Sequence, residues 1–264
     1  LRGMLYPQCF EKSAWIKKLS LWLYLKSDLQ RAACLHATCM EEMEHLRNMG
    51  IYAPVAVIPN PIRTSGLQDN IILPDGLRIG YLGRIHPRKR VERIFYALDA
   101  LQDKNLEILV IGDGDAAYIQ FLREEAKRLH LDRMIFTGFL SGEEKEKALK
   151  SLSYLVVPSD FENFGNIVTE ALVKGIPVIA SKGTPWEELN THRCGWWVDN
   201  DVDTLAATIR EALNTSEAER IAMGERGKHL IQENYSVDMV AGKLKRLYEW
   251  ILYGGEKPEF VYLK

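Results

Sequence analysis

The sequence predicts an α/β protein built around a doubly wound parallel sheet, preceded by a shorter strand–helix–strand pattern. From residue 77 onward, short apolar runs alternate with longer amphipathic stretches, as strands and helices do in such sheets. The runs are apolar at almost every position, which is typical of parallel strands buried on both faces. Turns with glycine follow several of the runs, where strands are expected to end.

Each predicted element follows from these signals. Before the sheet we expect a helix at residues 14–33, a strand at 34–38, a helix at 40–49 and a strand at 55–58. A polar stretch with proline and glycine, residues 63–76, reads as a linker between domains. The sheet strands are predicted at 77–82, 106–111, 134–137, 154–157, 177–180 and 195–198. Its helices are predicted at 88–101, 116–130, 142–152, 167–173, 202–213, 217–233 and 237–252. Residues 254–264 are expected to lack order or to pack against a neighbour.

Composition excludes several classes of function. A length of 264 residues suffices for one large or two small domains, and a net charge of −2 argues against bulk binding of nucleic acid. The four cysteines contain no C-x-x-C pair, which favours reduced thiols in a cytosolic protein. The six histidines form no H-x-x-x-H pattern, so no metal site is predicted. No signal peptide is visible.

The helix predicted at 14–33 has two interpretations. Its tryptophans Trp15 and Trp22 lie on or near one face, beside Lys17 and Lys18. That combination suits a peripheral contact with a membrane surface. Packing against the rest of a domain is the alternative, and we favour it.

The most informative segment is Asp160-Phe-Glu-Asn-Phe-Gly-Asn-Ile-Val-Thr-Glu170, between a predicted strand and the next helix. Glu162 falls in the loop and Glu170 lies inside the helix. Backbone N–H groups at the helix N-terminus suit an anion such as a phosphate. Two carboxylates would repel it, so we expect them to accept hydrogen bonds from hydroxyls of the same ligand. A ligand with central phosphates and hydroxyls at both ends is a nucleotide-sugar.

Taken alone, either glutamate is more simply a solvated side chain. The position of the segment changes that balance, because ligands of open α/β sheets bind just beyond the carboxyl ends of strands.

A cationic loop, Gly83-Arg-Ile-His-Pro-Arg-Lys-Arg90, follows the first strand of the sheet. Arg84 and Lys89 can clamp a diphosphate, the arginine as a planar fork and the lysine as a point charge. Solvated surface charge is the alternative interpretation of this loop.

The turn Gly112-Asp-Gly-Asp-Ala-Ala117 matches the dinucleotide pattern G-x-G-x-x-A. We do not predict NAD, because this is the second strand–helix unit of the sheet and because Asp113 and Asp115 would repel a pyrophosphate. Gly112 and Gly114 are expected to form a tight turn beside a nucleotide.

Two further strand ends face the same edge of the sheet. After the third strand, the backbone can meet a nucleobase, with Phe139 or Leu140 against the ring. Core packing is at least as good an interpretation of either side chain. Residues 181–188 follow another strand, start a helix and can line the same site.

Together these residues resemble the family 4 glycosyltransferases, retaining enzymes of the GT-B fold. The resemblance covers nearly the whole sequence. It is carried by Gly83-Arg84 with Lys89, Gly112-Asp113-Gly114, the Glu-x7-Glu pair Glu162 and Glu170, and Pro177-Val178-Ile179-Ala180. Two more segments are similar to the late part of the family's N-terminal domain, namely Arg2-Gly3-Met4-Leu5 and Val57-Ile58-Pro59-Asn60.

The resemblance implies two Rossmann-like domains, the first of them partial. Residues 1–64 correspond to the end of the N-terminal, acceptor-side domain, residues 65–235 to the nucleotide-sugar-binding domain, and residues 236–264 to a C-terminal helix and tail. The family carries a glycine-rich loop and a histidine near the donor sugar in the part that the sequence lacks. We therefore expect a piece of a longer protein, and assign no residue to those roles.

Roles for individual residues are also implied. Arg84 and Lys89 would bind the donor diphosphate and Glu162 the hydroxyls of the donor sugar, and these three are the predicted catalytic residues. The predicted donor-binding residues are Gly83, Gly112, Gly114, Phe139, Leu140, Asn163, Phe164, Gly165, Asn166 and Glu170, the last holding the ribose. The cations and amides would stabilise the leaving diphosphate without a metal or another cofactor. Arg90 departs from the family, which often has glycine there; it either adds a cation or crowds the phosphate.

The predicted activity is retaining transfer of a sugar from a nucleotide-diphosphate-sugar to a glycan or lipid-linked acceptor. We expect it in polysaccharide or lipopolysaccharide assembly in the cytoplasm, by family analogy. The main alternative is a non-catalytic nucleotide-sugar-binding fragment or a degenerate paralogue, which would bind donor without transfer. A third option is an epimerase acting on a UDP-sugar. The sequence does not select the base, the sugar or the acceptor.

Overall fold

The computed structural model describes residues 3, 6, 24–64, 76–102 and 106–263. The described residues belong to two compact units, Leu1–Arg63 with Asn234–Lys264, and Thr64–Glu233. Three parts of the sequence prediction lie outside the described residues. They are the face bearing Trp15, Lys17, Lys18 and Trp22, the segment around Arg2, and most of the predicted linker.

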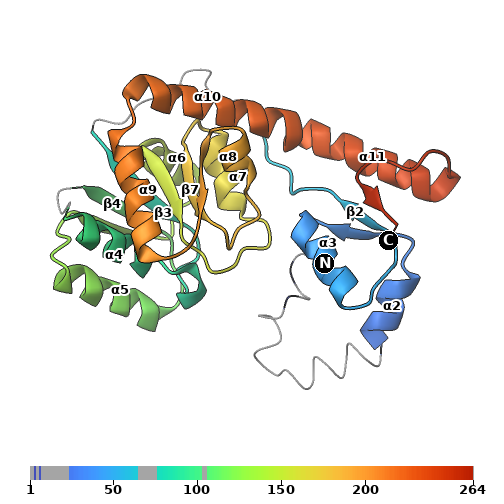
Figure 1. Ribbon diagram of the computed structural model, residues 1–264, viewed down its shortest axis with the longest axis horizontal. Coiled ribbons are helices and arrows are strands. Elements are labelled where there is room, and N and C mark those ends of the chain that lie inside the picture. The colour runs from blue at the N-terminus through green and yellow to red at the C-terminus, as the bar shows by residue number, and fades with distance from the viewer. Residues whose placement is uncertain (1–2, 4–5, 7–23, 65–75, 103–105, 264) are drawn as a thin grey trace. The chain divides into compact units, whose positions relative to one another are not determined.

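The larger unit is built on a parallel sheet, whose described strands number six in the order β5-β4-β3-β6-β7-β8 (Figure 1). The strands are β3 (Arg78–Leu82), β4 (Glu107–Ile111), β5 (Met134–Gly138), β6 (Tyr154–Val157), β7 (Val178–Ser181) and β8 (Gly195–Val198). The chain runs outward from β3 to β5 and then returns to β6 beside β3. The loops after β3 and β6 therefore leave a topological switch point, the place where open sheets of this type bind ligands.

Helices cover both faces of this sheet, which confirms the doubly wound prediction. One face is covered by α4 (Glu92–Leu101), α5 (Ala116–Arg128) and α9 (Val202–Asn214). The opposite face holds α6 (Gly142–Lys150), α7 (Asn166–Leu172) and α8 (Glu188–Thr191), as Figure 1 shows. The unit ends with α10 (Glu217–Asn234). Strand residues such as Ile79, Tyr81 and Tyr154 are fully buried, and each such side chain stabilises the fold by about 1.5–3 kcal/mol.

The connection between β3 and α4 differs from the prediction. The helix expected from residue 88 begins only at Glu92, after a 3-10 turn, η3 (Pro87–Lys89). Arg90, at φ 51° and ψ 39°, has a left-handed backbone that no α-helix accommodates. The His86 side chain holds the turn, because its Nδ1 accepts the Arg88 N–H at 3.2 Å. As a result, Lys89 is the last residue of the 3-10 turn and does not belong to helix α4.

The smaller unit has its own sheet, with three strands among the described residues in the order β1-β2-β9. Here β1 (Leu35–Ala37) runs parallel to β2 (Val55–Val57), and β9 (Val261–Tyr262) runs antiparallel to it. One core packs around α2 (Lys26–Arg31) and α3 (Met40–Asn48), and another packs around α11 (Val237–Tyr253). Within the described ranges, no helix is long and apolar enough to cross a bilayer.

Of the two expectations for the C-terminal tail, lack of order is wrong, because the tail packs against β2 and α11. Residues 261–262 form β9, and the Arg47 side chain donates to the Tyr262 carbonyl at 3.1 Å. The Phe260 side chain is buried, and the backbone carbonyl of Phe260 accepts a hydrogen bond from the Val57 N–H at 2.9 Å. A disordered segment would lack the apolar residues that this tail contains. Burying these residues offsets the entropy that is lost when the tail becomes ordered.

Candidate functional site

Three loops at the carboxyl ends of strands join through their backbones. The loop after β3 accepts a hydrogen bond at the Arg88 carbonyl from the Asp160 N–H of the loop after β6, at 3.0 Å. The same β6 loop donates the Glu162 N–H to the Gly183 carbonyl after β7, at 2.8 Å. Because β3 and β6 flank the switch point, the joined loops lie where the fold places a ligand.

Two predicted site residues meet at this junction. The Lys89 ammonium forms an ion pair with Glu162 Oε1, and the Ser159 hydroxyl donates to the same oxygen at 3.1 Å. The side chains are 23% and 13% exposed, so water screens the pair less than it screens a surface pair. A cation and a carboxylate from separate loops thus share one spot, where one ligand can reach both.

A buried tyrosine on β3 supports the loop that carries Arg84. Tyr81, on β3, is fully buried and donates its hydroxyl to the Arg84 carbonyl at 2.9 Å. Burial raises the pKa of Tyr81, and the nearby Glu162 carboxylate raises it further. The hydroxyl therefore stays protonated and fixes the backbone of Arg84, whose side chain is exposed.

The predicted glycine turn packs directly against the β3 loop. The Ile85 N–H donates to the Asp113 carbonyl at 2.9 Å, and the Asp115 N–H returns a bond to the Ile85 carbonyl at 2.8 Å. A Cβ on Gly112 would lie 1.9 Å from the Gly83 carbonyl oxygen, and one on Gly114 would lie 2.1 Å from that of Ile85. These glycines thus have a packing reason of their own, namely that they let the two loops run side by side. The Asp115 carboxylate caps α5, because it accepts a hydrogen bond from the Tyr118 N–H at 2.9 Å.

The segment 163–166 forms the entry to α7. Gly165, at φ 76°, is the residue before the helix, and a Cβ there would lie 3.3 Å from Trp186 Nε1. That indole donates to the Phe164 carbonyl at 2.6 Å, and the Phe164 and Trp186 rings pack 5.5 Å apart. Phe164 is buried, so its side chain supports the loop and is not exposed to a ligand. Asn163 is half-buried and Asn166 exposed.

Glu170 has a partner that the sequence did not suggest. Its carboxylate pairs with the Lys145 ammonium of α6 at 2.5 Å, with both side chains about one-third exposed. Helix α6 begins just after Phe139 and Leu140. Phe139 is 76% exposed, which rules out core packing for that ring, and Leu140 is half-buried. The structure thus brings Lys89 and Glu162 together and pairs Glu170 with another helix.

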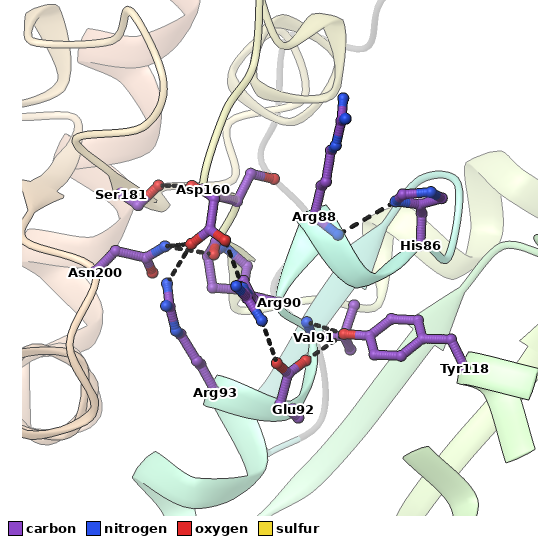
Figure 2. A network of polar contacts seen from close by, with 12 residues as sticks. His86, Arg88, Arg90, Val91, Glu92, Arg93, Tyr118, Asp160, Ser181 and Asn200 are labelled. Atoms are coloured by element: carbon purple, nitrogen blue, oxygen red, sulfur yellow. Dashed lines mark hydrogen bonds and ion pairs between the residues drawn. The ribbon is translucent and has the colours of Figure 1, made fainter. Parts of the chain in front are cut away.

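A network beside the site was not predicted, and Figure 2 shows it. Asp160 accepts hydrogen bonds from Arg90 at 2.5 Å, from Arg93 at 2.8 Å and from Asn200 at 3.2 Å. The Asp160 hydrogen bond is the main cause that raises the pKa of Arg90. Arg90 also lies 3.7 Å from the buried Glu92, to which the Tyr118 hydroxyl donates. The Arg90 guanidinium therefore points at carboxylates, Asp160 and Glu92.

The sequence contains a signal for some of the residues that we did not predict, Asp160 and Trp186, but none for Lys145. Asp160 opens the segment that we singled out, so its charge was available as a signal. Trp186 lies in the predicted strand-end stretch 181–188. Lys145 sits in a helix rich in both charges, where nothing in the sequence marks it. Among the described residues, no three His, Cys, Asp or Glu side chains gather as metal ligands would.

The fold is the one that the GT-B glycosyltransferases share. Sucrose-phosphate synthase of Thermosynechococcus elongatus shares this fold, with a TM-score of 0.80 and 23% identity over 97% of this chain and 67% of that one. HepE of Anabaena, solved with UDP and glucose, has a TM-score of 0.77 and 17% identity over 94% of this chain and 70% of that one.

The family follows from the sequence itself. The model of the glycosyl transferases group 1 matches residues 68–230, more than half of the chain, and the chain belongs to this family. An uncharacterized glycosyltransferase of Methanocaldococcus jannaschii is 27% identical over 71% of this chain and 47% of its own length. A GDP-mannose-dependent alpha-mannosyltransferase of Mycolicibacterium smegmatis is 34% identical over 57% of this chain and 38% of its own length. The chain thus spans less than half the length of these two relatives.

Proposed function

We propose that the larger unit binds a nucleotide-diphosphate-sugar at the switch point, as the donor for transfer of the sugar with retention of configuration, as family 4 enzymes do. One observation carries the proposal, the contact of Lys89 with Glu162 between the loops after β3 and β6. A cation and a carboxylate at one point suit a ligand in which a phosphate adjoins a sugar. That junction is the bond which a glycosyltransferase breaks.

Donor binding must open this ion pair. The diphosphate takes the Lys89 ammonium, with Arg84 as a second cation on the same loop, and a sugar hydroxyl takes the Glu162 carboxylate. Positive charge at the diphosphate then stabilises it as it leaves, and the effect grows where water is excluded. The acceptor attacks from the face that the nucleotide leaves. The proposal assigns these tasks to side chains and loop amides and requires no metal.

In this proposal, residues at α6 and α7 bind the nucleoside end of the donor. Glu170 would accept the ribose hydroxyls, while Lys145, at 2.5 Å, fixes the direction of its carboxylate. Phe139 exposes most of its ring after β5 and offers an apolar surface for a base. The diphosphate would then lie between Glu170 and the Lys89–Glu162 pair.

The relatives suggest which donors to test first. The mycobacterial relative is named as GDP-mannose-dependent, and the HepE structure contains UDP and glucose. GDP-mannose and UDP-glucose are therefore the first candidates. A glycan or lipid-linked acceptor, in polysaccharide or lipopolysaccharide assembly on the cytoplasmic side, completes the proposal.

Calorimetric titration of the 264-residue chain with UDP, GDP, ADP and their sugar conjugates tests the donor site. We expect saturable binding of one nucleotide series, weakened roughly hundredfold or more by Glu170→Ala, because two hydrogen bonds to a charged acceptor, each worth about 1.5–3 kcal/mol, are lost. Glu219→Ala is the matched control, since Glu219 also forms a 2.5 Å ion pair, with Arg226 on α10. Absence of binding throughout the panel, or equal loss in both variants, would contradict the donor site.

A further inference from the structure

The loops that carry Lys89 and Glu162 are tied together by charges that need not touch a ligand. Asp160 lies two residues before Glu162, and its carboxylate accepts hydrogen bonds from Arg90, next to Lys89, and from Arg93 on α4. Its backbone N–H binds the Arg88 carbonyl at 3.0 Å. Figure 2 shows both guanidinium groups pointing at the Asp160 carboxylate. The two loops are thus joined close to the proposed donor-binding side chains. Arg90 is next to Lys89 on one loop, and Asp160 is two residues before Glu162 on the other.

The backbone of Arg90 makes this arrangement more informative. Its φ of 51° lies in the left-handed region, which disfavours a side chain, and glycine would relieve that strain. Arginine at this position must therefore be stabilised by its contacts. Those contacts are the 2.5 Å bond to Asp160 and the 3.7 Å approach to Glu92.

Asn200 is a third side-chain partner of the Asp160 carboxylate, and Glu92 is a second partner of Arg90. The Asn200 amide donates to Asp160 Oδ1 at 3.2 Å and to the Pro158 carbonyl at 2.9 Å. Glu92 is itself buried, and the Tyr118 hydroxyl donates to its second oxygen. The charged groups of this network, on Arg90, Arg93, Asp160 and Glu92, are therefore paired with one another. Three elements, the β3 loop, α4 and the loop after β8, converge on Asp160.

We propose that Asp160 and Arg90 are positioning residues that set the separation of Lys89 from Glu162, and hence the fit of the phosphate–sugar junction of the donor. This inference rests on the proposed function for what the ligand is. A nucleoside monophosphate, which lacks that junction, does not depend on this separation.

The test measures two affinities and one exchange rate on the full chain. In Asp160→Asn, binding of GDP-mannose or UDP-glucose should weaken roughly tenfold, since misplacing one group by a fraction of an ångström has effects of that order. Binding of GMP or UMP should stay within about twofold, because it uses the Glu170 end. A variant that merely unfolds would lose both affinities together. Asp28→Asn is the matched control, as Asp28 pairs with Arg31 at 3.0 Å in the smaller unit.

Two variants of Arg90 separate its backbone from its side chain. Arg90→Gly removes both the left-handed strain and the ion pair, whereas Arg90→Ala removes only the ion pair. We expect both to lose donor affinity relative to the monophosphate, like Asp160→Asn. Donor affinity at the wild-type level in Arg90→Gly would overturn the proposal, because the arginine would then serve no purpose that glycine does not.

Hydrogen exchange without ligand keeps this inference separable from the proposed function. In Asp160→Asn we expect amides of peptides covering 86–91 and 158–163 to exchange roughly tenfold faster than in wild type. If wild type binds no nucleotide, the proposed donor site fails, but faster exchange still supports the tie between the loops. Unchanged exchange in Asp160→Asn overturns the positioning role, whatever the chain binds.

Discussion

Gly112→Ala should destabilise the larger unit more than any φ effect alone can explain. The new Cβ would lie 1.9 Å from the Gly83 carbonyl oxygen, and real Cβ atoms essentially never approach a heavy atom closer than 3.0 Å. The atom in the way belongs to the backbone, so no side chain can rotate aside. The loops after β3 and β4 must therefore part by about 1 Å.

The hydrogen bonds across this contact set the magnitude. The loops share the Gly83 N–H to Ile111 carbonyl bond and the Ile85 N–H to Asp113 carbonyl bond, both at 2.9 Å. Loss of two such bonds costs about 2 kcal/mol. Alanine at φ 141°, a conformation that only glycine readily adopts, adds about 1–3 kcal/mol. We expect a loss of about 3–5 kcal/mol in the free energy of unfolding.

Gly138→Ala is the matched control. Gly138 also has a positive φ, 73°, but its Cβ would meet nothing within 4 Å. It should therefore cost only about 1 kcal/mol. Urea denaturation of both variants, analysed at a common m-value, measures the difference. Equal losses in the two variants would refute the steric reasoning.

Three further predictions concern other parts of the chain. Cys194 is fully buried, and burial raises its pKa to about 12, so iodoacetamide at pH 8 should leave it unmodified in the folded protein and label it in denaturant; mass spectrometry showing equal labelling would contradict this. Asp201 caps α9, and its pKa is lowered mainly by the hydrogen bond from the Thr204 N–H, so Asp201→Ala should cost about 1 kcal/mol at pH 7. Because the folded pKa lies below the unfolded one, this wild-type advantage should be full above about pH 4 and shrink as pH falls through the folded pKa, and a constant gap in urea titrations from pH 7 to pH 3 would contradict it. Gly242→Ala lies on α11 with open space around the new Cβ and should stabilise the helix by about 0.5–1 kcal/mol; a lower melting temperature would contradict this.

The sheet, and the carboxyl edge at which the candidate site lies, could be predicted because their signals are local. The strands are short runs buried on both faces, so composition alone marks them, and β6 was placed at the residues that form it, Tyr154–Val157. Glycine and charged residues that directly follow a predicted strand indicate the carboxyl edge of the sheet. This is why Lys89 and Glu162, about seventy positions apart in the sequence, could be expected at one site.

What escaped prediction depends on partners distant in the sequence. The left-handed Arg90 is stabilised by Asp160, and no local pattern indicates that a charged residue will take a conformation suited to glycine. Lys145 acquires its significance only because α6 lies beside α7. The order of the tail depends on a free strand edge at β2, which the sequence of the tail does not reveal.

The most direct test of the proposed donor site is saturation-transfer difference NMR on the 264-residue chain with GDP-mannose and UDP-glucose. For the preferred donor, both ribose and hexose protons should receive saturation. Glu170→Gln should reduce the ribose signals and Glu162→Gln the hexose signals, because the two carboxylates would hold opposite ends of the ligand. Saturation that is absent for both donors, or that neither substitution changes, would contradict a nucleotide-sugar site at the switch point between β3 and β6.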